Sequence, residues 1–115
     1  MNRIKLVINN EANKNEREKF FIKQELQSIL NLYAKMVSNG SWKDYSFTSG
    51  IKEVSFDVYQ RASEKPVLRI LKNLKPRYFN EKYLIKDKNG AILKKSENLN
   101  QLISTTSWSK LKLVK

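Results

Sequence analysis

The hydrophobic pattern of the chain changes its period at Asn39-Gly40, and this change limits what the chain can fold into. Before it, apolar residues recur at steps of three and four, the pattern of one buried helix face: Ile22, Leu26, Ile29, Leu30, Tyr33 and Val37. The stretch Asn15-Glu16-Arg17-Glu18 has the form of a capping box, with asparagine at the N-cap. The sequence therefore predicts a helix over residues 16–38 that ends at Gly40.

After Gly40 the period falls to two, which is typical of strands with one buried face. Val54, Phe56 and Val58 alternate with polar residues. The link at residues 62–66 is too short for anything but an antiparallel connection to the next strand. Strands are predicted at residues 51–61, 67–72, 45–49, 83–86, 91–95 and 111–114, and a short helix at 98–104.

The loop at residues 87–90 decides how the last predicted hairpin is paired. It reads Asp-Lys-Asn-Gly, and Asn-Gly alone is typical of a two-residue turn, but that register sets apolar residues opposite polar ones. A type I turn over all four residues instead pairs Ile85 with Ile92 and Leu84 with Leu93. Since this register matches apolar with apolar, we predict the longer turn.

The helix presents one apolar stripe and the strands one apolar face, so each needs the other to bury apolar surface. We therefore predict an α+β fold, in which one long N-terminal helix packs on an antiparallel sheet of four to five strands as a two-layer sandwich. A chain of 115 residues suits one domain with an ordinary core. We place that domain at residues 16–115, after a flexible or strand-like segment at residues 1–15.

The composition argues against several kinds of chemistry. The chain has no cysteine and no histidine, which excludes disulfides, thiolate nucleophiles, Cys/His metal sites and imidazole acid–base catalysis. Glu53 and Asp57, four apart on one strand, lie roughly 13 Å apart at ~3.3 Å per residue, too far to act on one bond. Cross-strand ion pairing with Arg61 and Arg69 suits them better. We expect no enzymatic activity, no cofactor and no metal.

The apolar patch at residues 4–8 is too short for a signal-peptide core. No window approaches the roughly 20 apolar residues of a membrane span. We therefore expect a soluble, cytoplasmic protein with no membrane partner. The lack of cysteine fits a reducing compartment.

The net charge of +12 is concentrated in the second half of the chain, since residues 65–115 hold 13 basic and 3 acidic residues, against 10 and 8 in residues 1–64. This asymmetry favours a polyanionic partner, such as RNA or a ribonucleoprotein. Cations interleaved with aromatic rings suit phosphates and bases, and the candidate residues are Lys72, Lys75, Arg77, Tyr78, Lys82, Lys86, Lys94 and Lys95. Alternatively, the lysine-rich composition reflects AT-rich coding and carries no function.

A second hypothesis is a protein-interaction or homodimerisation module. It would use a sheet edge or the turn that carries Arg61, Ser63, Glu64 and Pro66. The segment Trp42-Lys43-Asp44-Tyr45 has two interpretations as well: a stacking platform for a base, or a seat for the helix on the sheet. We favour packing for Trp42, because most large aromatic residues belong to cores.

Several segments in order resemble the Domain of Unknown Function 2794 family, an uncharacterised bacterial family found in alphaproteobacteria. The resemblance spans about residues 20–103 and departs from the family pattern between Leu71 and Tyr83. It implies a small bacterial cytoplasmic protein of one domain and implies no activity. Its most specific parts are Leu32-Tyr33 to Gly40, Trp42-Lys43-Asp44-Tyr45, Arg61-Ala62-Ser63-Glu64 with Pro66, and Ile92-Leu93-Lys94.

Overall fold

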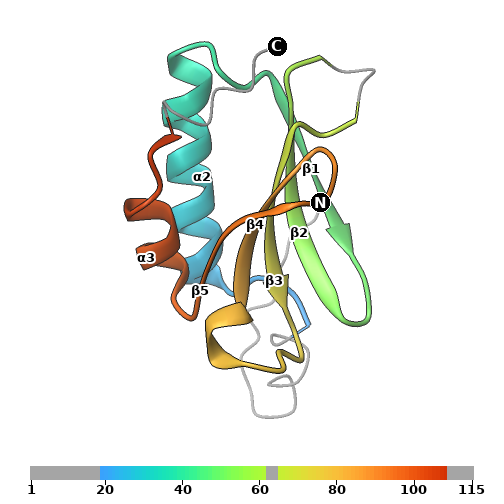
Figure 1. The fold of residues 1–115 in the computed structure, drawn as a ribbon. Helices are drawn as coiled ribbons and strands as arrows, with labels where there is room; N and C mark the ends of the chain where they lie inside the picture. The colour runs from blue at the N-terminus through green and yellow to red at the C-terminus, as the bar shows by residue number, and fades with distance from the viewer. Residues whose placement is uncertain (1–18, 62–64, 109–115) are drawn as a thin grey trace.

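Two layers, a helical one and a β-sheet, make up the computed structural model, which describes residues 19–61 and 65–108 (Figure 1). The five strands follow one another through the sheet in chain order, and every neighbouring pair is antiparallel. The predicted α+β class is confirmed. The elements are α2 (Lys23–Ser38), β1 (Asp44–Ser49), β2 (Glu53–Tyr59), β3 (Leu68–Asn73), the 3-10 turn η3 (Phe79–Glu81), β4 (Tyr83–Asp87), β5 (Ile92–Ser96) and α3 (Leu99–Ser104).

The main core lies between the helices and one face of the sheet, since α2 runs along that face with α3 beside it (Figure 1). Phe56 at the centre of β2 is fully buried, and so are Ile70 and Ile85, its neighbours across β3 and β4. The helices supply the opposite side of this core through Ile29, Leu32, Met36, Leu99 and Leu102. The apolar stripe and the apolar sheet face therefore meet as the periodicity predicts.

The start of the long helix differs from the prediction. Helix α2 begins at Lys23, and residues 19–22 are not helical. The predicted capping box at residues 15–18 lies outside the described residues. Phe21 is buried, and its ring packs 6.0 Å from that of Phe47 on β1. That contact accounts for the later start, because it draws the chain away from the helix axis.

The end of α2 follows the prediction. Gly40 has φ +82°, the left-handed conformation that glycine adopts without strain, and its N–H donates to the carbonyl of Val37. The next N–H, from Ser41, donates to Met36. These two bonds satisfy carbonyls that the helix leaves without an intrahelical partner.

The turn between β4 and β5 is the predicted four-residue turn. The N–H of Gly90 donates to the carbonyl of Asp87 at 3.0 Å, and Gly90 has φ +86°. The Asp87 carboxylate accepts from the backbone N–H groups of Asn89 and Ala91. Aspartate at the first turn position forms such bonds readily, which explains why this turn forms rather than the shorter Asn-Gly one.

The predicted register of this hairpin is wrong. Ile85 lies opposite Lys94 rather than Ile92, and an irregularity in the pairing leaves Leu93 without a cross-strand partner. Strand β5 is at the edge of the sheet, and Ile92 and Leu93 remain 52% and 40% exposed. Matching apolar residues would therefore have gained little burial here, so the apolar pattern did not set the register.

The remaining predictions of local structure divide into two groups. The strand at residues 45–49 and the short helix at 98–104 are confirmed as β1 and α3. Asn98 caps α3 by accepting from the Gln101 N–H at 2.9 Å. The segment at residues 1–15 and the strand at 111–114 lie outside the described part of the chain.

The contrast between β4 and β5 can be tested with one substitution at two isoleucines. Ile85→Ala should lower the free energy of unfolding by about 2–5 kcal/mol, because it opens a cavity in the core. Ile92→Ala should lower it by less than about 1 kcal/mol, because Ile92 is half-exposed on the edge strand. Urea unfolding followed by circular dichroism measures both, and equal losses would contradict the difference in burial between Ile85 and Ile92.

Candidate functional site

The residues of the predicted anion-binding surface do not share one face. Lys72 lies inside the protein. Lys94 points toward the helical side, where its Nζ donates to the carbonyl of Thr105. Strand alternation places Lys86 and Lys95 on the opposite sheet face. The connection between β3 and β4 carries the remaining ones: Lys75, Arg77, Tyr78 and Lys82.

Lys72 must be removed from the predicted anion surface, because its ammonium is already paired. Its Nζ lies 2.9 Å from Glu25 Oε1, and both side chains are more than 90% buried. The same Nζ donates to the carbonyl of Phe20 at 2.9 Å. Burying a charge is favourable only when it is paired and hydrogen-bonded, and here it is both. Lys72 therefore joins β3 to the start of α2.

Glu25 has a further partner in Tyr83 on β4, whose phenol donates a short hydrogen bond to Oε2. Glu25 Oε1 also accepts from the Ile22 N–H at 2.8 Å, which caps the first turn of α2. Burial, followed by the hydrogen bond and the negative charge of Glu25, raises the pKa of Tyr83 well above its ordinary value of about 10. The phenol thus stays protonated and keeps donating.

Sequence reasoning missed this network, although part of the signal was present. Lys72 follows Leu68 and Ile70 at steps of two, so strand alternation alone places it on the core face. Glu25 lies four residues before Ile29 and is on the apolar stripe of α2. A charge at a core position on each of two elements indicates a buried pair. What the sequence lacks is their distance, which depends on how α2 crosses the sheet.

The connection between β3 and β4 forms an exposed basic end of the sheet, which we call the basic tip: Lys75, Arg77, Tyr78, Phe79 and Lys82. The Asn73 N–H donates to the carbonyl of Lys82 at 2.7 Å and closes the base of the connection. Pro76 and the turn η3 shape its outer part. The Leu74 N–H donates to the carbonyl of Lys52, which ties the connection to the turn between β1 and β2. The tip is therefore held at both sides.

Aromatic rings and cations are exposed together on the basic tip. Tyr78 is 61% and Phe79 82% exposed. Lys75 and Arg77 are exposed just before the rings, and Lys82 just after them. Within residues 19–61 and 65–108, no carboxylate lies within ion-pairing distance of these three cations. Their charges are therefore not neutralised by the described protein.

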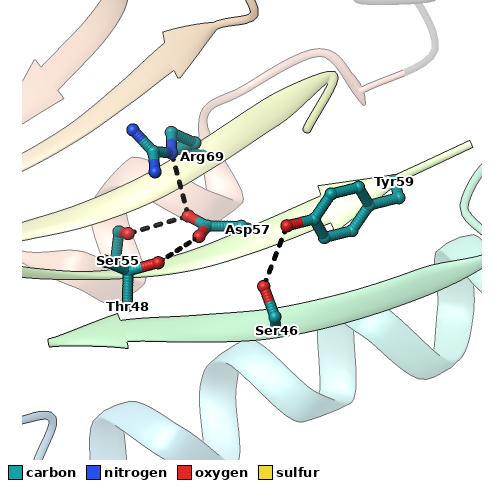
Figure 2. Close-up of polar contacts among 6 residues, drawn as sticks. All are labelled: Ser46, Thr48, Ser55, Asp57, Tyr59 and Arg69. Atoms are coloured by element: carbon teal, nitrogen blue, oxygen red, sulfur yellow. Dashed lines mark hydrogen bonds and ion pairs between the residues drawn. The ribbon is translucent and has the colours of Figure 1, made fainter. Parts of the chain in front are cut away.

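The sheet face away from α2 carries a second polar group, centred on Asp57 (Figure 2). Asp57 is 1% exposed, and its Oδ1 accepts from Ser55 Oγ at 2.7 Å and from Arg69 Nε at 3.0 Å. Its Oδ2 accepts from Thr48 Oγ1 at 2.7 Å. Beside it, the hydroxyls of Ser46 and Tyr59 are 3.0 Å apart. The predicted Asp57–Arg69 pair is confirmed, whereas the two hydroxyl donors were not predicted.

The interpretation of Trp42 as a packing residue is confirmed. Its side chain is 5% exposed, and its ring meets that of Trp108 edge to face at 5.8 Å. Tyr45 is 41% exposed and contacts the ring of Tyr33 at 4.8 Å. A stacking platform needs open ring faces, which the buried Trp42 does not offer.

The predicted interaction turn is described only in part. Arg61 is exposed two residues beyond the end of β2, and Pro66 is half-buried before β3. Ser63 and Glu64 lie outside the described residues, so their predicted role stays a prediction.

The described part of the chain is also free of two other features. It holds no group of three acidic, cysteine or histidine residues placed to bind a metal ion. No helix in it has the length and apolar character that crossing a membrane requires.

Taken together, the fold and the tip define a small two-layer α+β protein with a cationic, aromatic end. The model of the family described as "Protein of unknown function (DUF2794)" matches residues 19–103. The chain belongs to this family, as its sequence motifs indicated. No curated protein and no solved structure matches the chain. The matched range includes all five strands of the sheet and α2, and it ends within α3.

The raised pKa of Tyr83 predicts a pH dependence of stability. Since this pKa is higher in the folded than in the unfolded state, the phenol contributes stability that is full below about pH 10. That contribution is lost as the pH rises from there through the folded-state pKa. Tyr83→Phe should be less stable than wild type at pH 7, by about 1.5–3 kcal/mol for a hydrogen bond to a charged group. The difference should shrink above pH 10.

Urea unfolding between pH 7 and 11 measures both effects. Tyr78→Phe, which removes an exposed phenol hydroxyl, is the matched control and should keep the wild-type profile. A Tyr83→Phe variant whose stability falls in parallel with wild type above pH 10 would show that this phenol does not carry the effect.

Proposed function

We propose that this protein is a non-enzymatic binding module that holds single-stranded RNA at the basic tip. One observation carries the proposal: Tyr78 and Phe79, consecutive in the chain, are both largely exposed among cations that no described carboxylate neutralises. Charge alone is common on protein surfaces, and so are single exposed rings. Their combination on a connection held at both sides is what a nucleic-acid strand requires.

The rings supply the first part of the argument. Burying a phenylalanine side chain stabilises a protein by about 1.5–3 kcal/mol, and the exposed Phe79 contributes little of this. A base stacked on an exposed ring is worth about 1–3 kcal/mol, whatever the base. Stacking needs an unpaired base, so the rings favour single strands over duplex.

The cations supply the second part. Lys75, Arg77 and Lys82 are exposed on both sides of the rings in the chain, where they would meet the phosphates that flank a stacked base. Lysine ammonium groups contact phosphates without reading sequence. The expected binding is therefore salt-dependent and nearly independent of base identity. Duplex RNA, whose stacked bases are unavailable to the rings, would bind more weakly.

The alternative hypothesis, homodimerisation through a sheet edge, is favoured by the exposed Ile92 and Leu93 on β5. The same strand carries features that oppose edge-to-edge pairing. Its pairing with β4 is irregular where β4 passes from Ile85 to Lys86. Strand β5 also carries two lysines, Lys94 and Lys95. Bulges and lysines are devices that block the addition of another strand. We therefore favour the RNA hypothesis, and sedimentation at rising protein concentration tests the dimer.

The proposal predicts that a short single-stranded RNA binds with a slope of log affinity against log salt of about −0.7 per phosphate contact. Replacing both Lys75 and Arg77 with glutamine should make that slope about 1.4 units shallower. Tyr78→Ala with Phe79→Ala should weaken binding by about tenfold or more without changing the slope. Fluorescence anisotropy at several salt concentrations measures all three.

The control is the double variant Lys43→Gln with Lys88→Gln, which removes the same charge from the opposite end of the sheet. It should bind as wild type does. Binding that is absent even at low salt would end the RNA proposal, and so would equal losses in the control and in the tip variants.

A further inference from the structure

The sheet face away from α2 brings two cations together outside the basic tip. Asp57 lies opposite Arg69, and Arg69 lies opposite Lys86, so the three residues form one row across β2, β3 and β4. Residues directly opposite each other in an antiparallel pair lie on the same face, with Cβ atoms about 5 Å apart. Like charges at such positions destabilise a sheet. Arg69 and Lys86 are such a pair.

Asp57 holds the arginine of this pair in place. It is buried, and its two oxygens accept hydrogen bonds from Thr48, Ser55 and Arg69. Arg69 uses only its Nε–H in this contact, and its side chain is 38% exposed. Its terminal N–H groups have no acceptor among the described residues, and the one bond that Figure 2 draws from Arg69 is that of Nε to Asp57. Asp57 thus fixes the guanidinium and leaves its outer edge free.

The charges of the described residues around Arg69 do not balance. Asp57 neutralises one cation of the pair, and no carboxylate among residues 19–61 and 65–108 is paired with Lys86, which is half-buried. Among the described residues, one positive charge therefore remains beside the N–H donors of Arg69. A planar guanidinium fork next to an ammonium group matches the several oxygens and the charge of a phosphate group.

We propose that Arg69 and Lys86 form a binding site for a phosphate group on this sheet face, with Asp57 as the residue that positions Arg69. Two sources share this chemistry: a free phosphate or phosphate monoester, and a backbone phosphate of the RNA strand bound at the basic tip. The second source rests on the proposed function. Lys95 lies between the tip and the site. It pairs across from Leu84, two residues before Lys86, and is thus about 8 Å from Lys86.

Lys95 has one described partner, Glu81 on η3, at 3.6 Å, and both side chains are partly exposed. An exposed pair of this kind is weak and is easily exchanged for a phosphate. A strand leaving the tip would therefore meet Lys95 first and then the Arg69–Lys86 site. This deepens the proposed function by giving the RNA a direction across the sheet.

Nuclear magnetic resonance of the arginine Nε–Hε groups tests the site, because the Arg69 Nε–H is held by Asp57 and should give a protected signal. The full chain is titrated first with inorganic phosphate and then with a short single-stranded RNA. We expect the Arg69 signal to shift and saturate. Lys86→Gln should weaken the response about tenfold, the equivalent of one charge-assisted contact. Lys88→Gln, an exposed lysine on the β4–β5 turn, should leave it unchanged.

Arg69→Lys separates the shape of the fork from its charge. It retains the charge near Asp57 but loses the planar donors, so phosphate binding, read from the backbone amides of β3 and β4, should be lost. The same spectra show whether the variant is folded. If Arg69→Lys is unfolded, the titration of Lys86→Gln alone tests the site, because Lys86 has no described ion pair that the fold needs.

The outcomes separate this proposal from the previous one. A response to inorganic phosphate without RNA binding supports the site and overturns the proposed function. If the Arg69 signal shifts with RNA but not with inorganic phosphate, and Lys86→Gln weakens this shift, the site binds a backbone phosphate of the RNA. RNA binding that leaves the Arg69 signal unmoved overturns the site and leaves the basic tip intact. Equal weakening by Lys86→Gln and Lys88→Gln indicates general charge attraction, and this too overturns the site.

Discussion

The buried contact of Glu25 with Lys72 and Tyr83 is the interaction on which the arrangement of the two layers depends. It joins the first turn of α2 to β3 and β4, and Lys72 also holds the carbonyl of Phe20. Apolar packing alone permits a helix to slide or rotate on a sheet, because it has no direction. A buried ion pair with three hydrogen bonds does not, since moving either partner leaves a charge unpaired in the interior, at a cost of about 3–5 kcal/mol.

This constraint explains why the end of the sheet that carries the basic tip is firmly held. At the end that carries the tip, the Glu25 network and the buried Phe21 fix the start of α2. The connection from β3 to β4 begins after Asn73, the residue that follows Lys72, and it ends at Tyr83, so two members of the network bracket it in sequence. The tip is thus an exposed excursion from a rigid base, which is how binding loops are commonly built.

Periodicity predicted the elements and their layers, because burial of one face is a local property of the chain. It also predicted the ion pair between Asp57 and Arg69, since both residues belong to the polar faces of adjacent strands. It failed where the outcome depended on distant groups. Helix α2 begins late because Phe21 packs on β1, and Lys72 lies inside because Glu25, 47 residues earlier, meets it there. The register of β5 escaped prediction because an edge strand gains little from burial.

The structure also bears on the alternative in which coding bias alone makes the chain basic. Such a bias places lysines without regard to their surroundings. Here several candidate cations are engaged by the fold: Lys72 by Glu25, Lys94 by the last turn of α3, and Lys95 by Glu81. The others, Lys75, Arg77, Lys82 and Lys86, have no described carboxylate partner. Three of them border the exposed rings and the fourth faces an arginine fixed by a buried aspartate. Function, where charge carries it, is therefore to be sought in these residues rather than in the net charge of the chain.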